Sequence, residues 1–367
     1  MTLRSKIYDD IYFSKQSGVE ESLYTFIEAN QLSQRFKEIN EYPFTIGELG
    51  FGTGLNFLLT VQSFLENAPS HSILHYFSVE KHPLPLAEID VALKQFTRLD
   101  NLRLKLISIL GESSWLLQGF HTLFFDRRVR LTILTGDVLD RLQELAGGKF
   151  DAWFADGFAP VKNPDMWTLP VFQELARLSK TGTTISSFSS AGEVRRHLTQ
   201  VGFSIQKRAG YGNKREMIIG RFQGAEFETE ASRSGVDRKA IIVGGGISGL
   251  SVAESLLKRG WQVELNERHN VLASEASGNA TAMFLPYLTA DKTVISDLTF
   301  RGSETFISAL PVLKADHLLH RTGVIQRIGN LKDNTNDSEN QNSSISLVSG
   351  KEQDQESKTQ EREKRIS

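Results

Sequence analysis

The chain has 367 residues, of which 40% are hydrophobic, and its formal net charge is −2. This length favours two domains that each bury a core, and the charge excludes a protein that is basic throughout. The absence of cysteine excludes disulfides, thiolate catalysis and cysteine-ligated zinc. Since no run has the apolar length of a signal-peptide core or a membrane span, we expect a cytoplasmic protein without membrane contact or bound metal.

Residues 44–222 alternate short β-rich runs with helix-like stretches. The predicted strands, in chain order, are 44–50, 73–80, 129–137, 150–158, 182–189, 202–210 and 215–222. Strands that alternate with helices predict a mostly parallel α/β sheet. The last two runs are separated by a short polar turn, which predicts an antiparallel hairpin at the sheet edge.

The run "GELGFGTGLNFL" follows the first predicted strand and opens a helix. Its glycines allow the backbone to bend sharply and to approach a ligand, and the helix start offers free N–H groups. The spacing is not that of a dinucleotide-binding turn. It resembles motif I of class I S-adenosylmethionine-dependent methyltransferases, which have an acidic residue just before the loop. The cofactor-binding residues predicted here are Glu48, Gly50, Gly52, Thr53, Gly54 and Asn56.

Two further acidic residues follow strand ends. The methyltransferase resemblance implies that Glu80 accepts hydrogen bonds from the ribose hydroxyls and that Asp137 holds the adenine amino group. Each acid alone is typical of a solvated strand end. Together with Glu48 they place three acids at three successive strand ends, which favours a cofactor site.

The segment "DAWFADGFAPVKNPDMWT" is the most specific stretch. A buried strand leads into Asp156, and two prolines stiffen the loop that follows. The methyltransferase resemblance implies that the end of this strand faces the methyl acceptor, and we predict Asp156 as the catalytic residue. The predicted substrate-binding residues of this loop are Phe158, Lys162, Asn163 and Trp167. The alternative is a rigid surface turn with its tryptophan in the core.

This segment, the N-terminal "YDDIYFSKQSGVEESLYTFIEANQL" and the later "SSAGEVRRHLTQVGFSIQKRAGYGNKREMIIG" resemble the bifunctional tRNA 5-methylaminomethyl-2-thiouridine biosynthesis proteins, over about residues 8–327. The resemblance implies that the first half methylates the primary amine of 5-aminomethyl-2-thiouridine at the tRNA wobble position. It implies that the second half, a flavin oxidoreductase, produces that amine by removing a carboxymethyl group.

Basic residues gather near the end of the first half. Those predicted to contact tRNA phosphates, in a salt-sensitive manner, are Arg195, Arg196, Lys214 and Arg215, with Lys207 and Arg208 beside them. A solvated charged face is the alternative. A flipped wobble base stacked on an aromatic side chain would complete recognition, and Trp167 is the candidate.

A second glycine run, "AIIVGGGISGL", follows an apolar strand and opens a helix, as a dinucleotide-binding fingerprint requires. The predicted cofactor-binding residues are Gly244, Gly246, Gly249 and Glu267, and the resemblance makes the cofactor FAD. The segment "SEASGNATAMFLPYL" is similar to a family segment but departs from it at Thr281 and Ala282. We expect a truncated flavin domain that binds FAD weakly and lacks oxidase activity.

The sequence thus predicts an α/β protein in which a class I S-adenosylmethionine methyltransferase domain is followed by a partial FAD/NAD(P)-binding Rossmann domain and a disordered polar tail. The predicted boundaries are 1–222, a linker at 223–239, the flavin domain at 240–328 and the tail at 329–367. Two alternative functions remain: a methyltransferase for a small-molecule amine, and a non-catalytic nucleotide-binding remnant.

Overall fold

The computed structural model describes residues 3–13, 18–39, 43–146, 150–212, 214–224, 238–287, 289, 293–315, 317, 319–320, 324–327 and 345–348. The chain divides into two compact units, Met1–Leu313 and Lys314–Ser367. In the described part of the chain, no helix is both long and apolar enough to cross a membrane.

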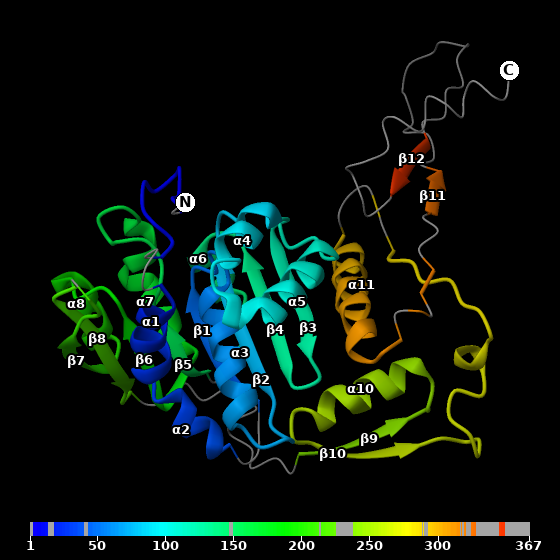
Figure 1. Cartoon of the computed structure of the whole chain (residues 1–367). Coiled ribbons are helices and arrows are strands. Elements are labelled where there is room, and N and C mark those ends of the chain that lie inside the picture. Colours follow the sequence, from blue (N-terminus) through cyan, green and yellow to red (C-terminus); the bar gives the residue numbers. More distant parts are fainter. Residues whose placement is uncertain are drawn as a thin grey trace, which may run out of the picture. The chain divides into compact units, whose positions relative to one another are not determined.

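Eight strands of the described residues form one sheet in the first unit, in the order β3-β4-β2-β1-β5-β6-β8-β7 (Figure 1). Their bounds are β1 Phe44–Leu49, β2 Leu74–Glu80, β3 Gly119–Asp126, β4 Val129–Thr135, β5 Phe150–Phe154, β6 Ser179–Ser187, β7 Phe203–Ala209 and β8 Glu216–Phe222. The strands from β4 to β6 run parallel, whereas β3, β8 and β7 pair antiparallel. The predicted α/β sheet and its edge hairpin are confirmed.

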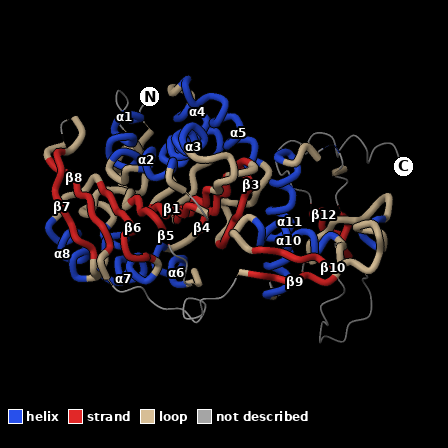
Figure 2. The backbone as a smooth tube through the Cα atoms, turned by 90° about the horizontal axis from the view of Figure 1, so that it is seen from below, coloured by secondary structure: helices blue, strands red, loops and turns tan. Residues whose placement is uncertain are grey.

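Helices cover both faces of this sheet (Figure 2). One face carries α1 Gly18–Ser22, the π-helix η1 Leu23–Glu28, α2 Leu32–Lys37, α3 Leu55–Asn67, α4 Leu86–Leu93, the 3₁₀ turn η2 Thr97–Leu99 and α5 Asp100–Gly111. The other face carries α6 Val138–Gln143, the 3₁₀ turn η3 Pro164–Trp167, α7 Leu169–Arg177 and α8 Gly192–Gln200. The chain adds β2 and β4 on one side of β1 and then β5 and β6 on the other side. Ligands of such sheets bind at this switch point, between β1 and β5.

The core on the second face explains one glycine of the first strand. Neighbouring residues of β5 point to opposite faces, so Phe154 packs in one core and Trp153 in the other. A Cβ atom at Gly47 would lie 2.0 Å from the Trp153 ring. The Trp153 indole N–H donates a hydrogen bond to Ser179 Oγ at 3.0 Å, which fixes the ring over Gly47.

Strand β3 is missing from the sequence-based prediction. It forms an antiparallel hairpin with β4 at one edge of the sheet. Its residues Leu123 and Phe125 are buried, but its other face is also apolar because Phe124 lies there against the Arg130 guanidinium, 3.5 Å from the ring centroid. The alternation of polar and apolar residues that identifies a half-buried strand is therefore weak.

A second glycine turn lies in a small parallel βαβ unit. Strand β9 Lys239–Val243 leads into helix α10 Ile247–Leu257, and β10 Gln262–Asn266 pairs parallel with β9. The short turn η4 Ala276–Gly278 and the long helix α11 Val294–Val312 follow. The predicted dinucleotide-type βαβ start is thus confirmed.

The second unit contains β11 Val324–Arg327 and β12 Ile345–Val348, which pair antiparallel. The tail predicted for 329–367 lies outside the described residues except for β12, a strand that its polar composition does not predict. Most of the linker predicted for 223–239 also lies outside them. The domain boundaries therefore stay predictions.

Candidate active site

The turn between β1 and α3 is built on three left-handed glycines. Gly50, Gly52 and Gly54 have φ of +95°, +53° and +77°, which side chains with a Cβ rarely adopt. Gly54 is also the capping residue that immediately precedes α3, so the free N–H groups of the helix face the turn. The predicted glycine turn is therefore present at the carboxyl end of a central strand.

A cleft of about 680 Å³ lies over this turn. Its walls come from the N-terminal segment, the turn, the end of β2 and the loop after β5. The predicted site residues that line it are Gly50, Gly52, Thr53, Asn56, Glu80, Asp156, Phe158 and Asn163. The structure therefore brings both halves of the predicted methyltransferase site together, although they are about a hundred residues apart in the chain.

Glu80 braces the glycine turn from the neighbouring strand. Its carboxylate accepts a hydrogen bond from the Gly52 N–H at 2.9 Å and another from the His82 N–H at 2.8 Å. Asp137 instead lines an adjoining pocket of about 290 Å³. There it caps α6 by accepting from the Leu139 N–H at 3.0 Å, and it pairs with Lys81 at 3.0 Å.

Glu48 lies beneath the cleft and is not among the residues that line it, which corrects its predicted role as a direct cofactor ligand. Its side chain is 1% exposed, and it accepts hydrogen bonds from Asn56 Nδ2 at 3.0 Å and from Ser78 Oγ at 2.7 Å. Burial raises the pKa of Glu48 to about 8. The residue therefore supports Asn56 from below and is mostly protonated at neutral pH.

Asp156 follows β5 and is held by two donors. Its Oδ2 accepts from Asn56 Nδ2 at 2.7 Å, and its Oδ1 accepts from the Gly157 N–H at 2.9 Å. Burial raises the pKa of Asp156 to about 6, although both hydrogen bonds act to lower it. One amide group, that of Asn56, thus links the buried Glu48 to the carboxylate that faces the cleft.

Trp167 does not reach the cleft, so it is not the platform for a base. Its side chain is 4% exposed, and the ring packs against Phe172 and Phe188. Its indole N–H donates to the Phe158 carbonyl at 3.1 Å, which ties the loop to the core. The alternative considered from the sequence, a tryptophan that plugs the core beneath a rigid loop, is correct for this residue.

The aromatic wall of the cleft comes instead from the N-terminal segment, residues 3–13. Tyr8 and Tyr12 line the cleft and contact Phe158, with ring centroids 4.8 and 5.2 Å apart. Neither tyrosine was predicted as a site residue. The signal was present in "YDDIYF", in which aromatic residues are interleaved with acids.

The acids of that segment fasten it to the loop after β5. Lys162 Nζ donates to the Asp9 carbonyl at 2.5 Å and lies 3.4 Å from Asp10 Oδ1. Asp10 also accepts from the Ala159 N–H at 3.3 Å. Lys162 therefore holds the two walls of the cleft together, a role different from the predicted direct contact with substrate.

The predicted basic residues lie on α8 and at the β7–β8 turn. The pKa of Glu216 is lowered mainly by its hydrogen bond from Lys207, and the charges of Arg215 and Arg195 lower it further. The two arginines therefore lie near the same carboxylate. Arg196 is exposed. Lys214 pairs with Glu21 at 2.6 Å and also acts to lower the Asp156 pKa, which places it on the side of the cleft that holds Asp156.

The predicted dinucleotide residues also come together. Gly244 has φ of +102°, and a Cβ at Gly249 would lie 2.0 Å from the Gly244 carbonyl oxygen. Gly246 caps the start of α10, and Glu267 accepts hydrogen bonds from the Gly245 and His269 N–H groups at 2.5 and 3.0 Å. Only glycine fits this close turn, so the residues suit the pyrophosphate and ribose of a dinucleotide.

Comparison with known proteins assigns a family to each part. Residues 108–223 match a family of S-adenosyl-L-methionine-dependent methyltransferases, and residues 239–345 match the FAD dependent oxidoreductases. In a curated relative from Pseudomonas fluorescens, 343 residues are 41% identical, covering 90% of this chain and 51% of the relative. In one from Pseudomonas paraeruginosa, 331 residues are 43% identical, covering 88% of this chain and 50% of the relative.

Both relatives are named tRNA 5-methylaminomethyl-2-thiouridine biosynthesis bifunctional protein MnmC, and the chain spans about half of their length. Among solved structures, MNMC2 from Aquifex aeolicus is similar at 24% identity with a TM-score of 0.46, covering 63% of this chain and 70% of that one.

Proposed function

We propose that this chain, which belongs to the family of bifunctional tRNA 5-methylaminomethyl-2-thiouridine biosynthesis proteins, methylates the primary amine of 5-aminomethyl-2-thiouridine at the tRNA wobble position. The observation that carries the proposal is the position of Asp156, which faces the same cleft as the glycine turn and is oriented by Asn56. The same cleft would also suit the alternative function, methylation of a small-molecule amine, but the relationship to this family favours tRNA as the substrate.

S-adenosylmethionine, when bound, supplies a methyl group already activated by its sulfonium. The residues fitted to hold it are those of the glycine turn and Glu80, because left-handed glycines leave room for a close ligand and Glu80 is an oxygen acceptor beside them. Asp137, in the adjoining pocket, is placed for a donor such as an amino group. The chain's main contribution is to align the acceptor nitrogen with the methyl carbon.

The acceptor nitrogen must be neutral, because only its lone pair can form the new bond to carbon as the bond to sulfur breaks. A carboxylate near an amine stabilises the ammonium form instead. Two features of the cleft oppose that effect. The rings of Tyr8, Tyr12 and Phe158 exclude water from the amine, and the protonated Glu48 adds no second negative charge beneath Asp156.

Asp156 then has two tasks. Its carboxylate accepts a hydrogen bond from the amine and so directs the lone pair, and it accepts a proton that the nitrogen releases. A pKa of about 6 suits this task, since the carboxylate is mostly ionised at neutral pH and still basic enough to take a proton. We place the flipped base against Tyr8 and Phe158, in the role that the sequence suggested for Trp167.

The second part supports a further proposal, that β9 and α10 hold the adenosine diphosphate end of FAD. Gly244, Gly246 and Gly249 would cradle the pyrophosphate, and Glu267 would face the ribose. FAD supplies a two-electron acceptor when bound. We place residues 223–239 as the linker between the two cofactor sites, and the protein in the cytoplasm, where its tRNA would be met.

The deciding experiment is transfer of labelled methyl from S-adenosylmethionine to tRNA that carries 5-aminomethyl-2-thiouridine, followed by nucleoside analysis. We expect 5-methylaminomethyl-2-thiouridine from the natural chain. Asp156→Asn should lower the transfer rate by about 10²- to 10⁴-fold while the cofactor dissociation constant stays within about twofold. Equal methylation of a free amine nucleoside and of tRNA would favour the small-molecule alternative. Equal losses of rate and cofactor binding in Asp156→Asn would reject the catalytic role.

A further inference from the structure

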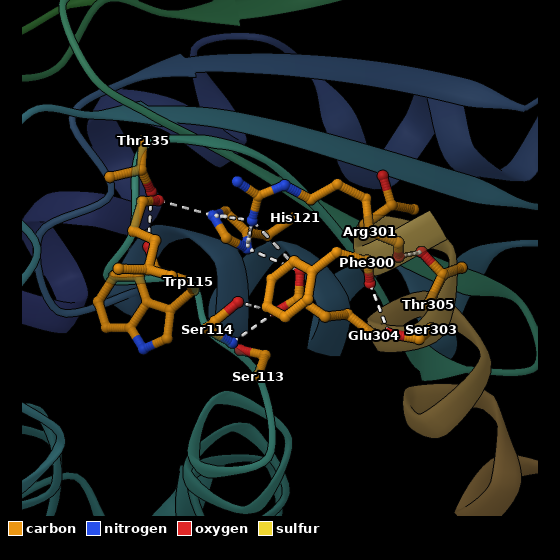
Figure 3. Close-up of polar contacts among 12 residues, drawn as sticks. Ser113, Ser114, Trp115, His121, Thr135, Phe300, Arg301, Ser303, Glu304 and Thr305 are labelled. Atoms are coloured by element: carbon orange, nitrogen blue, oxygen red, sulfur yellow. Dashed lines mark hydrogen bonds and ion pairs between the residues drawn. The ribbon is translucent and has the colours of Figure 1, made fainter. Parts of the chain in front are cut away.

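A polar cluster joins helix α11 to the edge strand β3, and it consists of Ser114, His121, Arg301 and Glu304 (Figure 3). Glu304 is 7% exposed and the His121 side chain is fully buried. Glu304 Oε1 accepts from both the Ser114 N–H, at 2.5 Å, and the Ser114 hydroxyl, and its Oε2 lies 3.3 Å from His121 Nδ1. A carboxylate so enclosed is stable only while these partners are present.

Other bonds fix α11 against the same edge. Arg301 lies 3.3 Å from Glu304 Oε2 and donates to the Gln118 carbonyl at 2.6 Å. Ser308, one turn further along the helix, accepts from the Phe124 N–H of β3 at 3.1 Å. Helix α11 thus satisfies a backbone donor of an edge strand as well as packing on it.

Ser114 is followed by Trp115, which packs beneath a residue of the cleft wall. Trp115 is 1% exposed, and its ring makes an edge contact with Phe51, with centroids 6.0 Å apart. Phe51 lies between Gly50 and Gly52 and lines the cleft. Glu304 is therefore connected to the glycine turn through two consecutive residues and one ring contact.

The same segment also reaches the adjoining pocket. The Trp115 carbonyl accepts a hydrogen bond from Thr135 Oγ1 at 2.7 Å (Figure 3). Thr135 ends β4, immediately before Gly136 and Asp137, which line that pocket. The glycine turn and the end of β4 thus both contact the segment Ser114–Trp115, and Glu304 is bonded to its first residue.

We propose that Glu304 of helix α11 is a positioning residue for S-adenosylmethionine binding, acting through Ser114 and Trp115. The helix lies within the part that matches the FAD dependent oxidoreductases, so this part of the chain helps to shape the methyltransferase cleft. The reason is that a fully bonded buried carboxylate selects one arrangement of its partners, and a neutral side chain holds them less tightly. The proposal requires cofactor binding and does not depend on the identity of the methyl acceptor.

The test uses the full chain and measures S-adenosylmethionine binding by calorimetry in Glu304→Gln. We expect the dissociation constant to rise by about tenfold, the size typical of losing one charged hydrogen bond. The matched control is Asp297→Asn, which removes a carboxylate from the same helix where it is 65% exposed and pairs with Arg301 at 3.3 Å. This control should stay within about twofold of the natural chain.

Hydrogen exchange separates positioning from general loss of stability. Peptides that cover residues 50–54 and 114–117 should exchange faster in Glu304→Gln, while those from α7 and α8 should not. If Glu304→Gln does not fold, Ser114→Ala carries the test, since it removes one donor to Glu304 and should weaken binding by about threefold. Folded variants with unchanged affinity would overturn the proposal. Failure of the natural chain to bind the cofactor would instead reject the proposed function itself.

Discussion

The shared amide of Asn56 gives the sharpest test of the proposed chemistry. Asn56 Nδ2 donates to Asp156 Oδ2 at 2.7 Å and to Glu48 Oε1 at 3.0 Å. The bond to Asp156 favours its ionised form, so Asn56→Ala should raise the Asp156 pKa above its value of about 6. A hydrogen bond to a charged group contributes about 1.5–3 kcal/mol and one pKa unit corresponds to about 1.4 kcal/mol, so we expect an increase of about one unit at this partly exposed carboxylate.

The loss of activity should depend on pH with a definite sign. The carboxylate accepts a proton only when ionised, so activity is present above the Asp156 pKa and is lost as pH falls through it. A rise of about one unit lowers the ionised fraction about fivefold at pH 6 and about twofold at pH 7. At about pH 8.5 and above the ratio of Asn56→Ala to the natural chain should level off at a constant value below one, because Asn56 also orients Asp156 and that loss does not depend on pH.

The assay is kcat/KM for methyl transfer to tRNA from about pH 5.5 to 9, expressed as the ratio of variant to natural chain. The acceptor amine has its own ionisation, which is common to both proteins and cancels in this ratio. The matched control is Asn67→Ala, since Asn67 lies further along α3 and its amide donates to the Ser63 carbonyl, at 2.8 Å, away from Asp156. A ratio for Asn56→Ala that is independent of pH, or that falls only at high pH, would refute the reasoning.

Three further predictions concern binding and stability. Tyr8→Leu should raise KM for tRNA by about tenfold with unchanged cofactor affinity, because a stacked base contributes about 1–3 kcal/mol. Trp167→Phe should instead lower the melting temperature. Steady-state kinetics and thermal unfolding measure the two effects, and finding each effect in the other variant would contradict the assignment. Arg215→Ala should reduce the slope of tRNA affinity against salt by about one, and an unchanged slope would exclude a phosphate contact. Gly47→Ala should lower the free energy of unfolding by about 1–3 kcal/mol, because the new Cβ would overlap the Trp153 ring; chemical denaturation with no change in midpoint would contradict this.

Local patterns predicted the parts of the fold that local chemistry specifies. The parallel strands, the glycine turn at 50–54 and the second turn at 244–249 each need particular residue types in consecutive positions. The place of Asp156 in the cleft could be predicted as well, because it lies just after the strand Phe150–Phe154 and before a glycine. In each case the residue types that the strand or turn needs lie within about ten neighbouring positions of the sequence.

The residues that were misplaced or missed depend on contacts between distant segments. Tyr8 lines the cleft in a segment that is held there by Asp10, which accepts a hydrogen bond from Ala159 and pairs with Lys162, about 150 residues away. Trp167 is as suitable for stacking a base as for filling a core, and its burial against Phe172 and Phe188 decides for the core. No short sequence pattern can predict whether such a tryptophan is exposed or buried, because burial depends on how the whole sheet packs with its helices.

The charge of Lys214 connects docking of the substrate to the chemistry. Burial raises the pKa of Asp156, and the charge of Lys214, which pairs with Glu21, partly opposes that rise. Lys214 is also a residue predicted to contact a tRNA phosphate. A phosphate that pairs with Lys214 offsets that positive charge, and the proton affinity of Asp156 then rises. Linkage makes the effect reciprocal, so a complex with a phosphate on Lys214 would contain a stronger base than the free protein, and protonation of that base would favour the docked state.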